Sequence, residues 1–190
     1  VERLQSSAHV LFLGKEDDFS LVSIHLPQSR RVETLSPDSL HGVDVLVVGP
    51  DFPQRFEELS ALIEPFVRSG GALLLLEQSR FIPGVLTWVD RTFPLVFISD
   101  PAHAVFSGMS DADLRFWNKA NPFENGAPGL TRGAFLKPAG GDLRILLEAG
   151  DGDFGWGGLL WTPLVEYTLG RGRVVCCQMG LGQYAASVPQ

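Results

Sequence analysis

Polar side chains follow two apolar runs of the sequence, at points where open α/β sheets hold ligands. Glu77 and Gln78 come directly after residues 72–76, and Asp51 comes shortly after residues 43–49. Ligands bind such sheets in the crevice outside the carboxyl ends of the strands. We therefore consider Asp51, Glu77 and Gln78 as residues of a ligand-binding or degenerate site. The alternative, which we favour, is that Asp51 caps a helix and that Glu77 and Gln78 make hydrogen bonds that stabilise the fold.

Ser79 is the nearest hydroxyl that could act as a nucleophile. A serine needs a positioned base for this chemistry, so Ser79 would require a histidine such as His103 or His9. The GxSxG turn that exposes a catalytic serine does not surround it. We interpret Ser79 as a turn residue and predict no catalytic residue in the chain.

Three further carboxylates could serve glycoside hydrolysis, which requires a pair roughly 5 to 10 Å apart. The candidates are Asp111, Asp113 and Glu124. Asp151 and Asp153 resemble the start of a calcium loop, but the twelfth position of that pattern is Thr162 in place of a carboxylate. The glycines and arginines of residues 170–173 do not match a phosphate loop and predict a hairpin turn. We predict no metal and no cofactor.

Two tryptophans could bind sugar, because exposed indole rings pack against sugar rings. Trp117 lies in the cluster Arg115-Phe116-Trp117-Asn118, and Trp156 lies in a glycine-rich segment. The alternative, which we favour, is packing in the core or at a domain interface.

Composition narrows the choice of partners. The formal net charge is -7 and the arginines are scattered, which argues against a nucleic-acid partner. No apolar run approaches the roughly 18 residues that a membrane span needs. The adjacent Cys176 and Cys177 lie in an apolar run and are expected to be small core residues rather than a disulfide or a metal site. The 190 residues predict one domain, 1–190.

Apolar runs separated by turn residues predict alternating strands and helices in the first half of the chain. The longest helical pattern should begin near Pro53 and stop at Gly70, with a kink or an early end at Pro65. A helix start is expected at Ser36-Pro37-Asp38. Strands are predicted at residues 9–13, 31–35, 43–49 and 72–76, and a helix between the first two of them. Short connections between a strand, a helix and a strand indicate a parallel crossover.

The second half is less regular. A short helix is predicted at residues 111–117, capped by Ser110 or Asp111. Further strands are predicted at residues 95–98, 135–136, 144–147 and 174–178. The fold class is therefore α/β, a three-layer, doubly wound and mainly parallel sheet with antiparallel strands added in the C-terminal half.

Several short segments of the sequence, taken in their order along the chain, resemble the class I glutamine-amidotransferase-like domains of some bacterial glycoside hydrolases. Examples are family 2 proteins and the middle domain of certain beta-galactosidases. The resemblance covers most of the chain. Its blocks are residues 43–50, 63–78, 100–101, 106–108, 113–117, 163–167 and 170–174.

That resemblance implies a flavodoxin-like fold and a site at the carboxyl ends of the strands. Active members of the superfamily carry a cysteine after the strand that corresponds to residues 73–76, whereas this sequence has Glu77, Gln78 and Ser79 there. Glutaminase chemistry requires a thiolate nucleophile, so this reaction is not expected.

Three hypotheses follow. The first is a non-catalytic structural or interaction domain of a glycoside hydrolase or another carbohydrate-processing protein, with neighbouring domains or another subunit as partners. The second is a sugar-binding module that uses Trp117 or Trp156, with carbohydrate as partner. The third is a stand-alone hydrolase of the amidotransferase-like superfamily. The absence of an initiator methionine and the resemblance lead us to expect a fragment of a larger protein.

Overall fold

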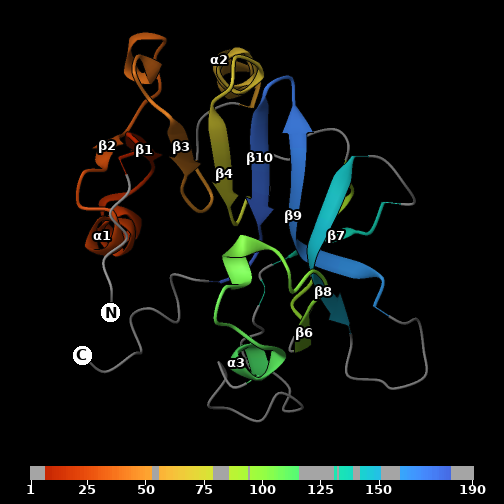
Figure 1. Cartoon of the computed structure of the whole chain (residues 1–190). Coiled ribbons are helices and arrows are strands. Elements are labelled where there is room, and N and C mark those ends of the chain that lie inside the picture. Colours follow the sequence, from red (N-terminus) through yellow and green to blue (C-terminus); the bar gives the residue numbers. More distant parts are fainter. Residues whose placement is uncertain are drawn as a thin grey trace. The chain divides into compact units, whose positions relative to one another are not determined.

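The structure is a computed structural model and describes residues 7–52, 56–78, 86–93, 95–115, 131, 133–138, 142–150 and 159–180. The chain forms two compact units, Val1–Phe81 with Tyr167–Val175, and Ile82–Glu166 with Cys176–Gln190. Its described residues form a mixed α/β fold with few helices (Figure 1). None of these helices is long and apolar enough to span a membrane.

Parallel strands make up the sheet of the first unit. They are β1 (Val10–Leu13), β2 (Arg30–Val32), β3 (Val45–Val48) and β4 (Ala72–Leu76), in the order β2-β1-β3-β4. All residues of β1 and the last three of β3 are buried, as expected of strands that are covered on both faces. The strands predicted at residues 9–13, 31–35, 43–49 and 72–76 are therefore confirmed, with boundaries that differ by up to three residues.

Helix α1 (Glu16–His25) follows β1 and begins with three acidic residues, which the positive end of a helix dipole favours. Phe19 and Val22 pack against Val10, Phe12 and Val47 of the sheet. The rings of Phe12 and Phe19 lie 5.7 Å apart, centre to centre. The predicted helix between the first two strands is confirmed, and aromatic packing anchors it.

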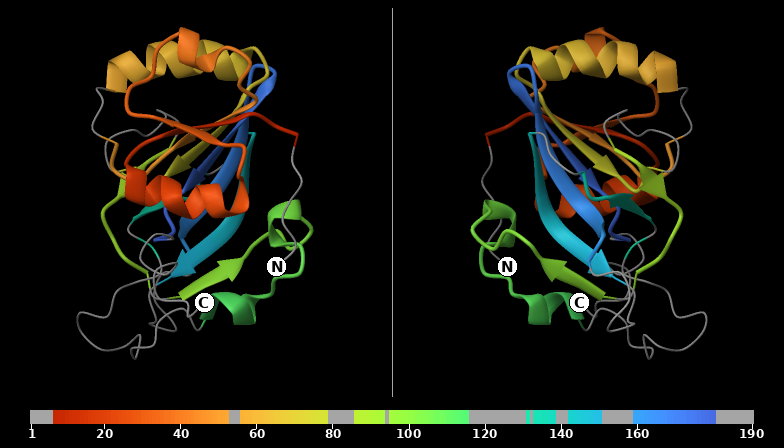
Figure 2. Two further views of the ribbon diagram at one scale, coloured as in Figure 1. Left: turned by 90° about the vertical axis from the view of Figure 1, so that its left-hand side faces the viewer. Right: turned by 90° about the vertical axis from the view of Figure 1, so that its right-hand side faces the viewer.

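Helix α2 (Phe56–Arg68) connects β3 to β4. Its buried residues Leu59, Ile63 and Val67 recur at intervals of four and form one apolar stripe. The early end that was one of two expectations at Pro65 is wrong, because the helix continues to Arg68, and the kink stays a prediction. Proline removes one backbone donor, but the stripe on both sides of it remains buried and holds the last turn in place. Figure 2 shows α1 and α2 from the side.

Between β2 and β3 the chain forms the 3-10 turn η1 (Asp38–Leu40), with Pro37 immediately before it. The helix start predicted at Ser36-Pro37-Asp38 is thus a single short turn. Ser36 and Ser39 close it through their hydroxyl groups, which lie 2.8 Å apart. Such a local bond between side chains suits a turn better than a continuing helix.

Asp44 is the one charged residue in the predicted strand 43–49, and the structure explains its presence there. Its carboxylate accepts a hydrogen bond of 2.8 Å from the backbone N–H of His9, and the Nδ1 atom of the His9 ring lies 3.2 Å from the same oxygen. The backbone hydrogen bond is the main cause that lowers the pKa of Asp44. Asp44 therefore holds the chain before β1 beside the start of β3.

Antiparallel pairs dominate the second unit. Its strands are β5 (Trp88–Val89), β6 (Leu95–Ile98), β7 (Ala134–Leu136) and β8 (Leu143–Gly150), with β5 paired to β7 and β6 paired to β8. The strands predicted at 95–98, 135–136 and 144–147 are confirmed. The two-residue β5 was not predicted, because a pair of residues gives no recognisable periodicity.

The described residues of the second unit also form two short helices, η2 (Ala104–Phe106) and α3 (Asp111–Arg115). The carboxylate of Asp113 accepts hydrogen bonds from the backbone N–H and the hydroxyl of Ser110, at 2.7 and 2.8 Å, which is a capping arrangement. Asp111 accepts a 2.7 Å hydrogen bond from the backbone N–H of Ile98. The prediction of a capped helix is confirmed for residues 111–115.

Strands β9 (Trp161–Leu169) and β10 (Gly172–Cys177) form a hairpin whose residues belong to both units. Ten strands of the described chain join one sheet, along the path β2-β1-β3-β4-β10-β9-β7-β5, with β6 and β8 off this path. The sheet contains parallel and antiparallel pairs, as predicted. The hairpin turn predicted at residues 170–173 is confirmed, with Gly170 at φ 64°.

Candidate functional site

The carboxyl ends of β3 and β4 bring two of the predicted site residues together. The backbone N–H of Asp51 donates a hydrogen bond of 3.2 Å to the carbonyl of Glu77. Both residues have a left-handed backbone, with φ of 44° at Asp51 and 43° at Glu77. Such a conformation is uncommon outside glycine and costs of order 1 to 3 kcal/mol, so it marks a place where the surrounding structure imposes the turn.

Gln78 ties the same two strands together. Its side-chain nitrogen donates to the carbonyl oxygens of Gly49 and Leu76, the second at 2.6 Å. The side chain is enclosed, with 3% of Gln78 exposed. Both amide hydrogens of Gln78 are therefore committed to backbone carbonyls at the ends of β3 and β4, as the fold-stabilising interpretation anticipates.

An aromatic ring fills the space beside the glycines that end β1 and β3. A Cβ atom on Gly14 or Gly49 would lie 2.7 or 2.8 Å, respectively, from the ring of Phe12, so any side chain at either position would force that ring to shift. Phe12 is fully buried. The order β2-β1-β3 reverses direction between β1 and β3, which is where open sheets bind ligands, and here a core side chain lies against both strand ends.

Glu77 has a strained, left-handed backbone directly after a strand, which is one feature of a nucleophile elbow. Hydrolases of α/β folds place their catalytic serine on such a strained turn after a strand. Here the turn holds a carboxylate that is 6% exposed. The two cysteines of the chain, Cys176 and Cys177, are both buried on β10, and burial raises the pKa of the Cys176 thiol. A buried thiol of raised pKa is a poor nucleophile.

Several other predicted residues lie outside the described part of the chain. They are Ser79, Trp117, Glu124, Asp151, Asp153 and Trp156. The remaining carboxylates proposed for glycoside hydrolysis, Asp111 and Asp113, bind the backbone of Ile98 and Ser110 as described above. Within the described residues no three histidine, cysteine, aspartate or glutamate side chains gather in a way that could hold a metal ion.

Sequence reasoning missed a histidine–glutamate pair in the second unit. Nε2 of His103 lies 3.3 Å from an oxygen of Glu166 on β9, and the two side chains are 12% and 11% exposed. The other ring nitrogen, Nδ1, accepts a 3.3 Å hydrogen bond from the backbone N–H of Val105. With both ring nitrogens engaged, His103 fastens η2 to β9. The charged Glu166 within the otherwise largely apolar residues 163–167 was the sequence signal that could have indicated this pair.

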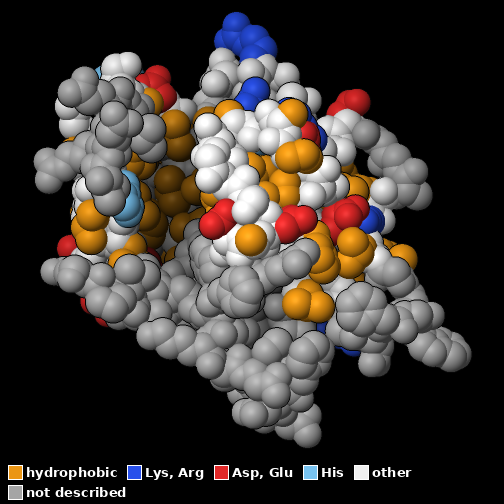
Figure 3. All heavy atoms as spheres, turned by 60° about the horizontal axis from the view of Figure 1, so that its bottom comes forward, with side chains coloured by type: hydrophobic (Ala, Val, Ile, Leu, Met, Phe, Trp, Pro, Cys, Tyr) orange, Lys and Arg blue, Asp and Glu red, His pale blue; other side chains and the backbone are white. Residues whose placement is uncertain are grey.

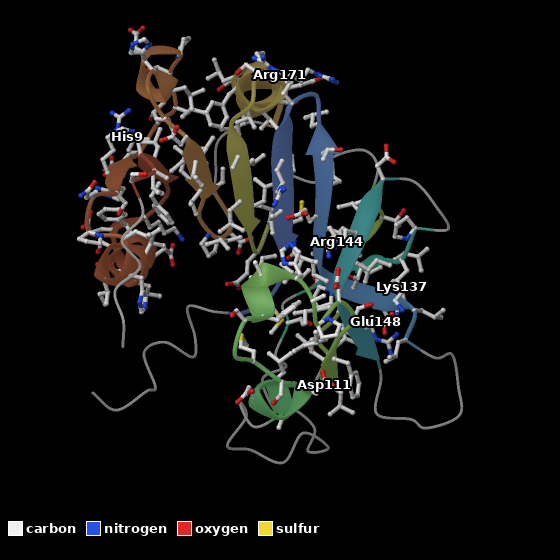
Figure 4. The ribbon with its side chains drawn as sticks, in the orientation of Figure 1. His9, Asp111, Lys137, Arg144, Glu148 and Arg171 are labelled. Carbon is white, nitrogen blue, oxygen red and sulfur yellow. The ribbon has the colours of Figure 1, made fainter. Side chains whose placement is uncertain are left out.

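Strand β8 contributes one residue to each of two ion pairs, one part-buried and one exposed. Lys137 pairs with Glu148, and Arg144 pairs with Asp100 (Figure 4). The hydrogen bond from the Arg144 guanidinium is the main cause that lowers the pKa of Asp100. An ion pair at an exposed position, such as Arg144–Asp100, contributes little stability.

Solved structures share this fold, whereas sequence comparison gives no match. No family model and no curated protein matches the chain. A chain described as a cytoplasmic protein from Salmonella typhimurium matches with a TM-score of 0.53 at 12% identity, over 90% of this chain and 87% of that one. At such identities the likeness shows the fold alone.

Two glycoside hydrolases match over nearly all of this chain. They are a beta-galactosidase from Rahnella sp. R3, with a TM-score of 0.54 at 12% identity over 95% of this chain, and an exo-beta-1,4-mannosidase from Opitutaceae bacterium strain TAV5, with 0.52 at 13% over 94%. The chain spans 30% of the first protein and 32% of the second. The fold therefore occurs as one part of larger carbohydrate-cleaving proteins.

Proposed function

We propose that the chain is a single non-catalytic domain of a carbohydrate-processing protein, with a flavodoxin-like fold of the class I glutamine-amidotransferase type. Its partners are neighbouring domains of the same polypeptide or another subunit. The observation that carries this proposal is the use of Gln78 as a structural clamp at the edge where related enzymes would bind substrate.

The strand order supports the flavodoxin-like assignment. Flavodoxin-like sheets have the order 2-1-3-4-5, and β2-β1-β3-β4 followed by β10 has the same pattern, although the fifth strand comes from the end of the chain. The crossovers β1 to β2 and β3 to β4 run in opposite directions across the sheet. Right-handed crossovers of this kind place their helices on opposite faces, which gives three layers.

The residues at the ends of β1, β3 and β4 support the proposal of a non-catalytic domain. Glu77 and Gln78 are buried and Phe12 lies against the ends of β1 and β3. A hydrolase needs a nucleophile, an oriented base and room for the substrate. In the described residues this edge offers hydrogen bonds within the fold.

Exposed leucines in the second unit support a role in protein contacts. Leu136, Leu159 and Leu160 are 43%, 36% and 50% exposed, and the backbone N–H of Lys137 donates to the carbonyl of Leu160, which brings β7 beside the start of β9. Apolar side chains occupy parts of the surface seen in Figure 3. Grouped apolar side chains on a surface are typical of interaction sites.

The proposal is tested by assaying the chain for hydrolysis of chromogenic glycosides and of glutamine, beside the variant Glu77→Gln. We expect no turnover above the buffer rate for either protein. Turnover by the wild-type chain that Glu77→Gln abolishes would overturn the proposal and support the stand-alone hydrolase. The sugar-binding alternative based on Trp117 and Trp156 concerns residues outside the described part and stays a prediction.

A further inference from the structure

A groove in the first unit lies away from the strand ends discussed above. It runs between η1 and α2, which are neighbours in two perpendicular views (Figures 1 and 2). Its volume is about 780 Å³, within the range of small-molecule sites. Leu40, Leu62 and Phe66 line it and are each half-buried.

The edges of the groove carry hydrogen-bonding groups. Asp38 and His41 lie on the η1 side, and Ser69 lies at the end of α2. The hydroxyl of Ser69 donates to the carbonyl of Phe66 at 2.8 Å, so its oxygen lone pairs are oriented by the helix end. Asp38 is exposed, and a carboxylate accepts hydrogen bonds only.

Pro65 adds an apolar ring to the same groove. It has no backbone N–H, so it offers the groove no hydrogen-bond donor. Both Ala61 and Pro65 line the groove. The groove thus combines apolar side chains with two hydrogen-bond acceptors, the Asp38 carboxylate and the Ser69 hydroxyl oxygen.

We propose that this groove is a carbohydrate subsite that takes one or two pyranose rings. A pyranose has an apolar C–H face, which matches Leu62 and Phe66, and equatorial hydroxyls, which donate to Asp38 and to the Ser69 oxygen. The assignment of sugar as the ligand class rests on the proposed function in a carbohydrate-processing protein. The site itself differs from the strand-end crevice and from the tryptophans considered above.

The test is a titration of the ¹⁵N-labelled chain with methyl β-galactopyranoside and methyl β-mannopyranoside, with glucitol as an open-chain control. We expect saturable shifts for at least one glycoside, confined to residues 37–41 and 61–69, and none for glucitol. Asp38→Ala should weaken binding about tenfold, because a charge-assisted hydrogen bond is lost. Asp142→Ala, at an exposed aspartate of the second unit, should leave it unchanged.

Phe66 supplies a second variant, Phe66→Leu, which should weaken binding by loss of the flat ring. Phe66 also contacts Gly71, so its folding is checked by urea unfolding, and Asp38→Ala carries the test if Phe66→Leu does not fold. Absence of saturable shifts, shifts outside the groove, or equal affinity in Asp38→Ala would overturn the proposal. Binding of an apolar peptide without binding of either glycoside would also overturn it. None of these results bears on turnover, on which the proposed function stands or falls separately.

Discussion

The backbone of Asp51 hydrogen-bonds the backbone of Glu77, and each of the two residues adopts a left-handed conformation. Asp51 follows β3 and Glu77 follows β4, so this hydrogen bond fixes the direction in which both segments turn away from the sheet. Neither side chain is needed for it. The candidate site is therefore shaped by the backbone and could keep its form while its side chains changed.

Gln78→Glu should destabilise the fold by about 2 to 3 kcal/mol, because it replaces the buried nitrogen that donates both hydrogen bonds with an oxygen that faces the carbonyls of Gly49 and Leu76. Urea unfolding followed by tryptophan fluorescence measures the change. Gln28→Glu makes the same chemical change at an exposed turn and should have almost no effect. Equal unfolding midpoints for the two variants would contradict the clamp.

Gly172→Ala should destabilise the protein strongly, by about 3 kcal/mol or more. A Cβ atom there would lie 2.1 Å from the carbonyl oxygen of Val67 and 2.3 Å from that of Gly71, and backbone atoms cannot move aside as a flexible side chain can. Gly42→Ala is the matched control, since φ is +70° there but nothing lies within 4 Å. It should cost about 1 kcal/mol from backbone strain alone. The prediction fails if thermal unfolding ranks the two variants the other way.

The bond between His9 and Asp44 should make stability depend on pH in acid. The pKa of Asp44 is lower in the folded chain than in the unfolded one, chiefly because the His9 backbone N–H binds the carboxylate. Its contribution is therefore complete above the unfolded value of about 4 and is lost as the pH falls through the folded value.

Urea midpoints of the wild type and Asp44→Ala should consequently differ at about pH 5 and converge as the pH is lowered further. Asp142→Ala serves as the control for loss of an exposed carboxylate. If the difference in urea midpoint between the wild type and Asp44→Ala stays constant down to the lowest pH, the ionised Asp44 carboxylate does not stabilise the fold.

Cys176 and Cys177 should resist alkylation in the folded chain. They are 2% and 7% exposed, and burial raises the pKa of Cys176, so little thiolate is present to react. Mass spectrometry after iodoacetamide treatment at neutral pH should find neither thiol modified, and both modified once urea is added. Rapid modification without denaturant would show that β10 opens readily.

The N-terminal half of the fold was predictable because its strands are short apolar runs bounded by glycine and proline. Residues 72–76 were predicted with their boundaries. Strand β9 was not recognised, because two of its residues interrupt the apolar pattern. Pro163 has no backbone N–H to donate, and Glu166 carries a charge. The structure places Glu166 against His103, a contact between residues 63 positions apart along the chain that periodicity cannot reveal.

The sequence predicted where the residues of the candidate site lie in the fold, but not the contacts that they make there. Position after a strand was enough to select Asp51, Glu77 and Gln78. The left-handed turns and the two carbonyl partners of Gln78 depend on the neighbouring strand β3, so no local pattern encodes them. The groove beside Pro65 was not anticipated, because proline was considered only as a helix breaker.

Strand β10 lies next to β4 in the sheet although almost a hundred residues separate them in the chain. During synthesis β1 to β4 emerge from the ribosome first. The edge of β4 that pairs with β10 in the folded protein stays unpaired until the β9–β10 hairpin has also emerged. Unpaired edges recruit other chains, so nascent molecules are most vulnerable to aggregation in that interval. A stop codon before residue 172 would make this transient hazard permanent.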